Sequence, residues 1–198
     1  RLKSSLPPLA SIDDISTKAL TGLFPDQGFN IAPSNHTQIS TEIATDAATC
    51  TDCLKDVFES ENRRYLYPFT NCTNCGPRYS IIRQLPYDRQ FTTMAKFAMC
   101  DACQEEYRDP ANRRFHAQPN ACPDCGPEIK LYDSCGAAIL DPDPIAHTVS
   151  LLKQGKIVAI KGLGGYHLVC DAANKQAVER LREKKLRKSK PLSLMAAN

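Results

Sequence analysis

The chain has 198 residues, of which 42% are hydrophobic and 24% charged, and these values are typical of a globular protein. No apolar run approaches the length of about 18 residues that a membrane-spanning helix needs, and the first residues show no signal-peptide pattern, so membrane and secreted proteins are disfavoured. The formal net charge is +3, but residues 175–190 carry eight Lys and Arg against two Glu, a local charge of +6 that leaves −3 for the rest. This distribution argues against a broad basic groove for nucleic acid and favours one anion-attracting segment near the C-terminus.

The first 34 residues predict the end of a larger domain. Residues 11–20 and 29–32 are expected to form two short strands, joined by a turn that contains Gly, Pro and Asp. Because two strands cannot close a core, we expect the first part of this domain to be missing from the chain. Residues 35–49 are rich in Ser, Thr and Asn and predict a linker.

Eight of the ten cysteines form four C-x-x-C pairs, and the third and fourth pairs repeat the first and second 50 residues later. Eighteen residues separate the two pairs of each half, and neighbouring Arg, aromatic and Gly-Pro positions match as well, so the region is an internal duplication. The pairs are Cys50 and Cys53, Cys72 and Cys75, Cys100 and Cys103, and Cys122 and Cys125.

This spacing predicts two zinc sites. Two C-x-x-C turns can close a tetrahedral shell of four thiolates around zinc, and the repeated spacing favours zinc over disulfides. A complete shell is typical of a structural site, so we assign no catalytic residue to this chain. Each ion is expected within one repeat, and loss of Cys50 should then unfold the first repeat more than the second. An interleaved pairing of the two repeats stays open. Gly76 and Gly126, which follow the second pair of each repeat, are expected to adopt positive φ.

Two arginine pairs occupy equivalent places in the repeats: Arg63 and Arg64, and Arg113 and Arg114. A shared structural role, such as hydrogen bonding to backbone carbonyls of the cysteine turns, is the main interpretation, and anion binding is the alternative. His116 is expected to be packed or hydrogen-bonded, since four thiolates already complete the shell. The apolar residues within 78–99 are expected to pack the two repeats together.

The residues after the second repeat predict the beginning of an α/β domain. A hairpin is expected from 129–131 and 137–140, and then a helix that Asp143 caps and that ends before Gly155. A buried strand over 156–160 leads into the glycine-rich stretch 162–165, for which a phosphate-binding loop and a plain tight turn both stay open. Asn174 is expected to cap a second helix, and residues 192–196 predict a further strand.

The cysteine pattern, together with RRYLYPFTNC at 63–72, PYDR at 86–89, YRDP at 107–110 and RRFHAQP at 113–119, resembles the HypF-type carbamoyltransferases, which are hydrogenase maturation factors. The resemblance covers essentially the whole chain and implies an α+β protein. It divides the chain into the C-terminal part of a ferredoxin-like acylphosphatase domain (1–34), a linker (35–49), zinc finger 1 (50–83), an inter-finger segment (84–99), zinc finger 2 (100–133), and a connector with the N-terminal part of an α/β YrdC-like domain (134–198).

The resemblance also implies a function for the full-length protein. ATP and carbamoyl phosphate would form carbamoyl adenylate, and the carbamoyl group would pass to the C-terminal cysteine of the partner HypE, for the cyanide ligands of nickel-iron hydrogenase. Carried onto matching positions, Lys161, Lys185 and Arg187 are candidate contacts to phosphate or carbamoyl oxygens. Residues 162–164 are Gly-Leu-Gly where the tRNA-modifying YrdC relatives usually carry Thr-x-Thr, which favours the hydrogenase-type enzyme. The fragment is expected to be inactive by itself.

The alternative is a binding module in which two zinc knuckles and a basic helix bind RNA or a protein partner. An aromatic content of 7% and basic residues confined to one segment argue against nucleic acid. Many unpaired thiols are typical of a reducing compartment, so we expect a cytoplasmic protein.

Overall fold

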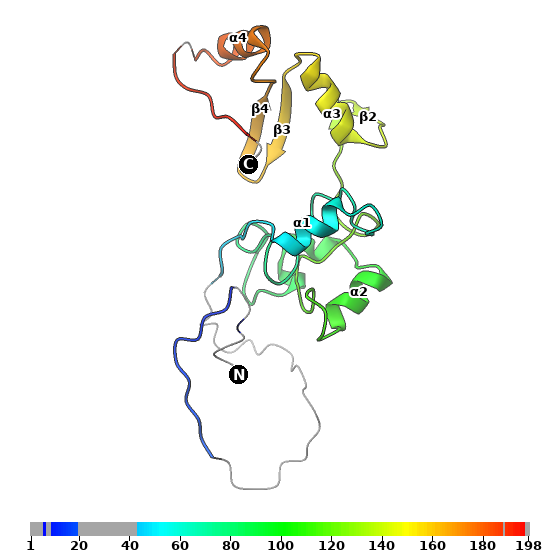
Figure 1. The fold of residues 1–198 in the computed structure, drawn as a ribbon, viewed down its shortest axis with the longest axis vertical. Coiled ribbons are helices and arrows are strands. Elements are labelled where there is room, and N and C mark those ends of the chain that lie inside the picture. The colour runs from blue at the N-terminus through cyan, green and yellow to red at the C-terminus, as the bar shows by residue number, and fades with distance from the viewer. Residues whose placement is uncertain (1–5, 7–8, 20–42, 188, 197–198) are drawn as a thin grey trace. The chain divides into compact units, whose positions relative to one another are not determined.

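The computed structural model describes residues 6, 9–19, 43–187 and 189–196. The chain divides into two compact units, Arg1–Pro127 and Glu128–Asn198, which are described one at a time (Figure 1). Residues 11–19 form no strand, so the strand predicted over 11–20 is wrong in its described part, and the strand predicted over 29–32 lies outside the described residues. Among the described helices, none has both the length and the apolar character needed to cross a membrane.

Each cysteine repeat of the first unit contains one short helix. These are α1 (Thr51–Phe58) and α2 (Asp101–Arg108), and each begins directly after the first cysteine of its repeat. Cys50 and Cys100 have extended backbones at the N-cap. An acidic residue in the first turn of each helix interacts favourably with the positive end of the helix dipole. The sequence does not predict these helices, because eight residues are too few for a helical period to stand out.

The loop after each helix folds back onto that helix. The N–H of Leu66 donates to the carbonyl of Val57 at 2.8 Å, and the N–H of His116, the equivalent residue, donates to Tyr107 at 3.0 Å. Leu66 and His116 both have left-handed backbones, with φ of 55° and 52°. The His116 ring lies 4.9 Å from the Tyr107 ring and 4.6 Å from the Phe115 ring, centroid to centroid, so the prediction of a packed histidine is confirmed.

A small apolar core joins the repeats, as predicted for the apolar residues of the segment 78–99. That segment forms two 3-10 helices, η2 (Arg89–Phe91) and η3 (Thr93–Lys96). It places Ile81 and Met94 against Tyr67 of the first repeat and Ala121 of the second. The Arg89 guanidinium donates to the carbonyl of Phe97 in the same segment and to those of Gln118 and Asn120 in the second repeat, at 2.6–2.9 Å. Four buried residues make a modest core, which leaves much of the stability of the unit to other contacts.

Glycine is required after each second cysteine pair for two different reasons. Gly76 has φ of +93°, as predicted, and a Cβ there would meet Asn71 Cβ at 2.6 Å. Gly126 does not have positive φ, so that prediction is wrong. Instead, a Cβ at Gly126 would lie 2.1 Å from the Tyr67 hydroxyl and 2.6 Å from Ala121 Cβ. Close packing between the repeats excludes a side chain there.

The second unit begins with a two-stranded hairpin, β1 (Leu131–Tyr132) and β2 (Ala138–Ile139), close to the predicted position. Helix α3 (Pro144–Lys153) follows, with Asp143 accepting from the N–H of Ala146 at 2.9 Å. Gly155 ends the helix with φ of +73°. Helix α4 (Lys175–Lys184) is capped by Asn174 and buries Ala177 and Leu181. The predicted caps of both helices are therefore confirmed, although α3, unlike α4, has no buried residue.

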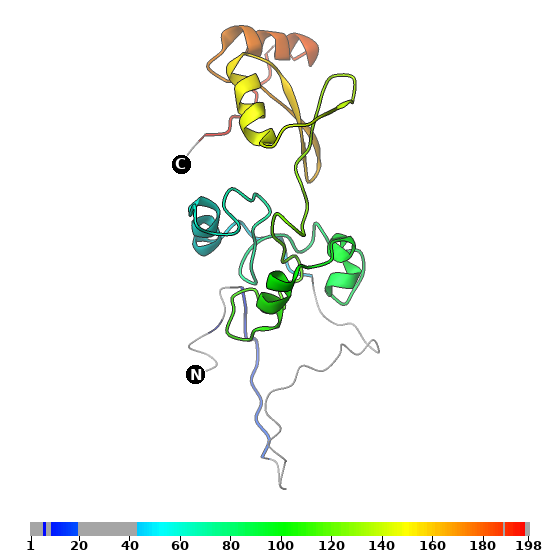
Figure 2. The same ribbon diagram turned by 90° about the vertical axis from the view of Figure 1, so that its right-hand side faces the viewer.

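The glycine-rich stretch is a hairpin turn. Strands β3 (Val158–Gly162) and β4 (Gly165–Val169) pair antiparallel with Gly162 opposite Gly165, so two residues make the connection (Figures 1 and 2). The tight-turn alternative is the one observed, and β4 was not predicted. The buried strand predicted over 156–160 corresponds to β3, but β3 is largely exposed. Residues 192–196 form no strand.

Candidate metal centres

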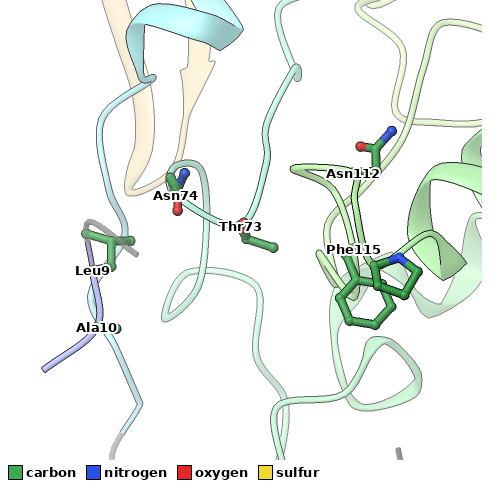
Figure 3. Close-up of a pocket in the computed structure, with 7 residues that line it drawn as sticks. Leu9, Ala10, Thr73, Asn74, Asn112 and Phe115 are labelled. Atoms are coloured by element: carbon green, nitrogen blue, oxygen red, sulfur yellow. The ribbon is translucent and has the colours of Figure 1, made fainter. Parts of the chain in front are cut away.

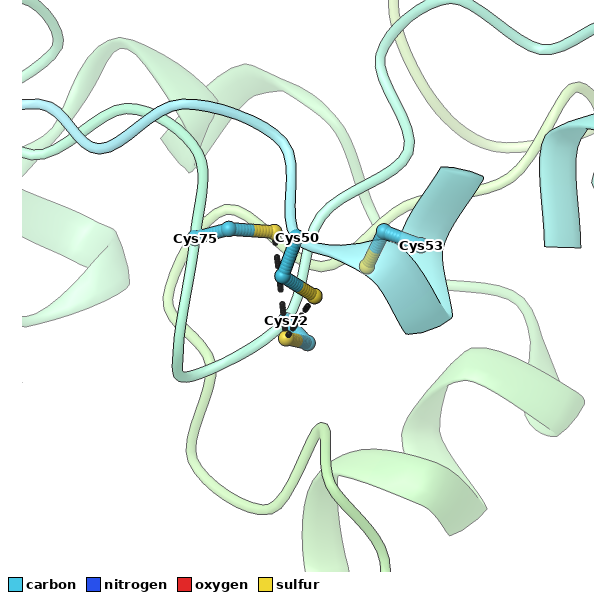
Figure 4. Close-up of side chains that lie close together, drawn as sticks. All are labelled: Cys50, Cys53, Cys72 and Cys75. Atoms are coloured by element: carbon cyan, nitrogen blue, oxygen red, sulfur yellow. Dashed lines mark hydrogen bonds between the residues drawn. The ribbon is translucent and has the colours of Figure 1, made fainter. Parts of the chain in front are cut away.

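The four thiols of the first repeat come together in one cluster. Cys50 and Cys53 lie at the start of α1, and Cys72 and Cys75 lie on a tight turn 18 residues later. The four Sγ atoms lie within 4.8 Å of one another, with Cys72 Sγ at 3.7 Å from Cys50 Sγ and 3.8 Å from Cys75 Sγ (Figure 4). The last three cysteines are buried.

The second repeat forms the same cluster at the start of α2. Cys122 Sγ lies 3.7 Å from both Cys100 Sγ and Cys125 Sγ, and Cys125 Sγ lies 3.6 Å from Cys103 Sγ. Each cluster therefore draws its thiols from a single repeat, and the interleaved alternative is not what the structure contains.

The geometry of both clusters fits zinc. Four sulfurs at about 2.3 Å from a central zinc, in a tetrahedron, lie about 3.8 Å from one another. The observed separations of 3.6–3.8 Å match that value and are far above the disulfide length of about 2.05 Å. All ten cysteines are free. Burial raises the pKa of the Cys103 thiol above its usual range despite the nearby Arg63, and a bound zinc ion would hold this sulfur as a thiolate.

The first arginine of each pair reaches the thiol cluster of the opposite repeat. Arg63 donates to Cys103 Sγ at 3.1 Å and to Glu106 at 2.7 Å. Its equivalent, Arg113, donates to Cys53 Sγ at 2.8 Å and forms an ion pair with Asp56. Positions 53 and 103 are equivalent in the duplication, so the two contacts are reciprocal.

The second arginine of each pair is buried between the repeats. Arg64 is 1% exposed and donates through Nε to the carbonyl of Ala121 at 2.9 Å. Arg114 is 5% exposed and donates through Nε to the carbonyl of Asn71 at 3.0 Å. The predicted structural role is confirmed, but the carbonyls belong to the opposite repeat, which sequence spacing could not indicate.

One carboxylate in each repeat accepts from both arginines of the other repeat. Glu106 lies on α2 and pairs with Arg63 and Arg64 at 2.7 and 2.6 Å. Asp56 lies on α1 and pairs with Arg113 and Arg114. Burial opposes the charge on Glu106, but the hydrogen bonds and positive charge of the arginines, Arg64 first, outweigh it and lower its pKa to about 2. These carboxylates were not singled out in the sequence, although their 50-residue spacing marks them as equivalent.

The candidate substrate contacts lie in the second unit and are exposed. Lys161 is on β3, with Nζ 5.9 Å from the centre of the Tyr166 ring. Lys185 is the C-cap of α4, and Arg187 follows Leu186, whose backbone is left-handed with φ of 51°. In the part of the chain that the structure describes, no hydrogen bond or ion pair joins Lys161 to Lys185 or Arg187. Their shared role in substrate binding stays a prediction.

An open pocket of about 470 Å³ lies on the first unit, lined in part by Thr73 and Asn74 of the turn between Cys72 and Cys75 (Figure 3). None of its lining residues ionises, so it offers no acid, base or metal ligand. The lining residues are Leu9, Ala10, Thr73, Asn74, Pro110, Asn112 and Phe115.

The fold and the two clusters define a class of protein, namely a tandem four-cysteine finger followed by the start of an α/β unit. The family model described as HypF finger matches residues 49–82 and 99–132, and the Sua5/YciO/YrdC model, described as telomere recombination, matches 150–198. The chain belongs to the HypF family.

Curated relatives align along nearly the whole chain. Carbamoyltransferase HypF2 of Cupriavidus necator is 54% identical over 100% of this chain, and carbamoyltransferase HypF of Rhodobacter capsulatus is 53% identical over 98%. The chain spans 25% and 26% of the length of these two proteins.

Solved HypF structures share the fold. The crystal structure of T. kodakarensis HypF matches with a TM-score of 0.73 and 52% identity, over 78% of this chain and 20% of that one. Full-length HypF in a phosphate- and nucleotide-bound form matches with a TM-score of 0.68 and 50% identity, over 75% of this chain and 19% of that one.

Proposed function

We propose that this chain is the finger-bearing segment of a HypF-type carbamoyltransferase and that its eight paired cysteines bind two structural zinc ions. The observation that carries the proposal is the pair of four-thiol clusters with tetrahedral sulfur separations. Bound zinc would cross-link the start of each helix to a turn 18 residues later, in a unit whose apolar core is small. Four thiolates fill the tetrahedral shell, so the zinc centres would hold the fold and leave the chemistry to other parts of the enzyme.

The reaction of the full-length protein is part of the same proposal. It would form carbamoyl adenylate from ATP and carbamoyl phosphate and pass the carbamoyl group to the C-terminal cysteine of a HypE-type partner. Support comes from the names of the relatives, from the phosphate- and nucleotide-bound form of one HypF structure, and from the basic segment at the end of α4. The many free cysteines are typical of a reducing compartment, and we infer a cytoplasmic protein.

Three cations of the second unit would contact the substrates. Lys161, Lys185 and Arg187 are exposed and free of carboxylate partners among the described residues, so their charges are available to phosphate oxygens. Lys185 and Arg187 flank the left-handed Leu186, where the chain turns sharply at the end of α4. Exposed cations at a helix C-terminus also complement the helix dipole, so an experiment must separate ligand binding from helix stabilisation.

Arg187→Ala in the full-length enzyme is expected to abolish the carbamoyl-phosphate-dependent exchange of pyrophosphate into ATP. The same change should alter the free energy of unfolding by less than about 1 kcal/mol, because the side chain is exposed. Isotope exchange and thermal unfolding measure the two effects. Lys175→Ala, which removes an exposed cation at the opposite end of α4, is the control and should keep the exchange. Exchange by the Arg187 variant at the wild-type rate would reduce this segment to a solvated helix end.

A further inference from the structure

Each thiol cluster accepts a hydrogen bond from an arginine of the other repeat. Arg63 lies between the two cysteine pairs of the first repeat, yet its guanidinium bonds to Cys103 Sγ at 3.1 Å in the second. Arg113 lies between the pairs of the second repeat and bonds to Cys53 Sγ at 2.8 Å in the first. N–H donors to a metal-bound sulfur are outer-shell contacts, which orient the ligand and tune the metal.

A group of arginines and a carboxylate lies beside each thiol cluster. Arg113 and Arg114 pair with Asp56 beside the first cluster, and Arg63 and Arg64 pair with Glu106 beside the second. Arg114 also lies 3.6 Å from Glu106, so the two groups are linked, and Asp124 accepts from Cys122 Sγ at 3.6 Å in the second cluster. A zinc ion with four thiolates would carry net negative charge beside the guanidinium that donates to one of its sulfurs. Each guanidinium therefore favours the loaded form of the centre that it contacts.

The crossing contacts also connect each metal centre to the backbone that carries the other centre. Arg63 and Arg64 belong to the loop between Cys53 and Cys72, so their anchoring in the second repeat restrains the loop that delivers Cys72. In the opposite direction, the carbonyl of Arg113 accepts from the N–H of Thr73 at 3.1 Å and from its hydroxyl at 3.0 Å, inside the cysteine turn of the first repeat.

We propose that the two zinc centres are thermodynamically coupled, so that binding of zinc to one repeat raises the zinc affinity of the other, through Arg63 and Arg113. Loading of one centre fixes an arginine of the opposite repeat, and part of the ordering needed for the second centre is then already complete. The inference rests on the proposed zinc binding, but it concerns the relation between the centres and is independent of carbamoyl transfer.

Native mass spectrometry of the whole chain, with one zinc ion supplied per metal-free, reduced chain, tests the coupling without any variant. Coupled centres are expected to give mainly chains with no ion or two ions. Independent or unequal centres give roughly half of the chains, or more, with a single ion. A singly loaded fraction of half or more would overturn the coupling, whereas failure to bind zinc at all would overturn the proposed metal centres themselves.

Variants then identify the arginines as the cause. In a chain with both Arg63→Met and Arg113→Met, the singly loaded fraction is expected to rise to about half, and zinc affinity should fall on the order of 10-fold in competition with a chelator. Arg78→Met is the matched control, because Arg78 is buried and its guanidinium donates to carbonyls of the first repeat, including those of Cys72 and Cys75. It should weaken the first centre and keep the scarcity of singly loaded chains. If the double variant still loads mainly in pairs, Arg63 and Arg113 do not transmit the coupling.

Discussion

Removal of zinc is expected to unfold both cysteine repeats together. The first unit has a buried apolar cluster of only Tyr67, Ile81, Met94 and Ala121, whereas a structural zinc site supplies on the order of 10–16 kcal/mol to folding. That contribution equals or exceeds the whole stability of a typical domain, about 5–15 kcal/mol. Amide hydrogen exchange over residues 43–127, before and after a chelator is added to the reduced chain, measures the effect.

A chelator that is saturated with zinc beforehand is the control, and it should leave amide exchange unchanged. Sequence spacing alone predicts that loss of Cys50 unfolds the first repeat more than the second. The contacts between the repeats change that expectation, because Arg113 and Arg114 lose their acceptors in the first repeat when that repeat opens. Cys53→Ser is therefore expected to raise exchange in α2 as well as α1. Protected amides in a zinc-free chain would contradict the prediction.

Arg64→Met is expected to cost about 3–5 kcal/mol of unfolding free energy, because it breaks a buried ion pair and leaves Glu106 without its main partner. The Arg64 side chain donates to Glu106 at 2.6 and 2.9 Å, to Asn120 Oδ1 at 3.0 Å and to the carbonyl of Ala121 at 2.9 Å. Methionine fills part of the volume but supplies no donor, so these acceptors lose their bonds in a largely buried site.

Denaturant unfolding of the zinc-loaded chain measures this cost. Arg108→Met makes the same chemical change at an exposed position at the end of α2, and its effect should stay within about 0.5 kcal/mol. Arg114→Met, the equivalent change in the second repeat, should resemble Arg64→Met because Arg114 bonds to Asp56 and to the carbonyl of Asn71 in the same manner. A loss below about 1 kcal/mol for Arg64→Met would show that the interface between the repeats does not depend on it.

Features with a local cause could be predicted from the sequence. The four cysteine pairs mark both thiol clusters because a C-x-x-C turn and the fixed spacing determine which sulfurs can meet. Asp143 and Asn174 are recognisable as helix caps because a cap bonds only two or three residues ahead. The positive φ of Gly76 is of the same kind.

Features that depend on tertiary contacts could not be predicted. The duplication indicates that Arg63 and Arg113 share a role, but nothing local says that each contacts the opposite repeat. Gly126 follows its cysteine as Gly76 does, yet its requirement comes from the Tyr67 hydroxyl, 59 positions earlier in the chain. The apolar residues 192–196 match a strand pattern, but a strand also needs a neighbour to pair with, and the described part of the second unit supplies none.

The central claim is that two tetrahedral thiolate centres, each formed within one repeat, hold this segment together. X-ray absorption at the zinc edge, combined with metal analysis of the chain after gel filtration, tests it most directly. We expect two zinc ions per chain, each with four sulfur neighbours at about 2.3 Å. One ion or fewer per chain, nitrogen or oxygen in the zinc shell, or disulfides at the cysteine pairs would contradict the account.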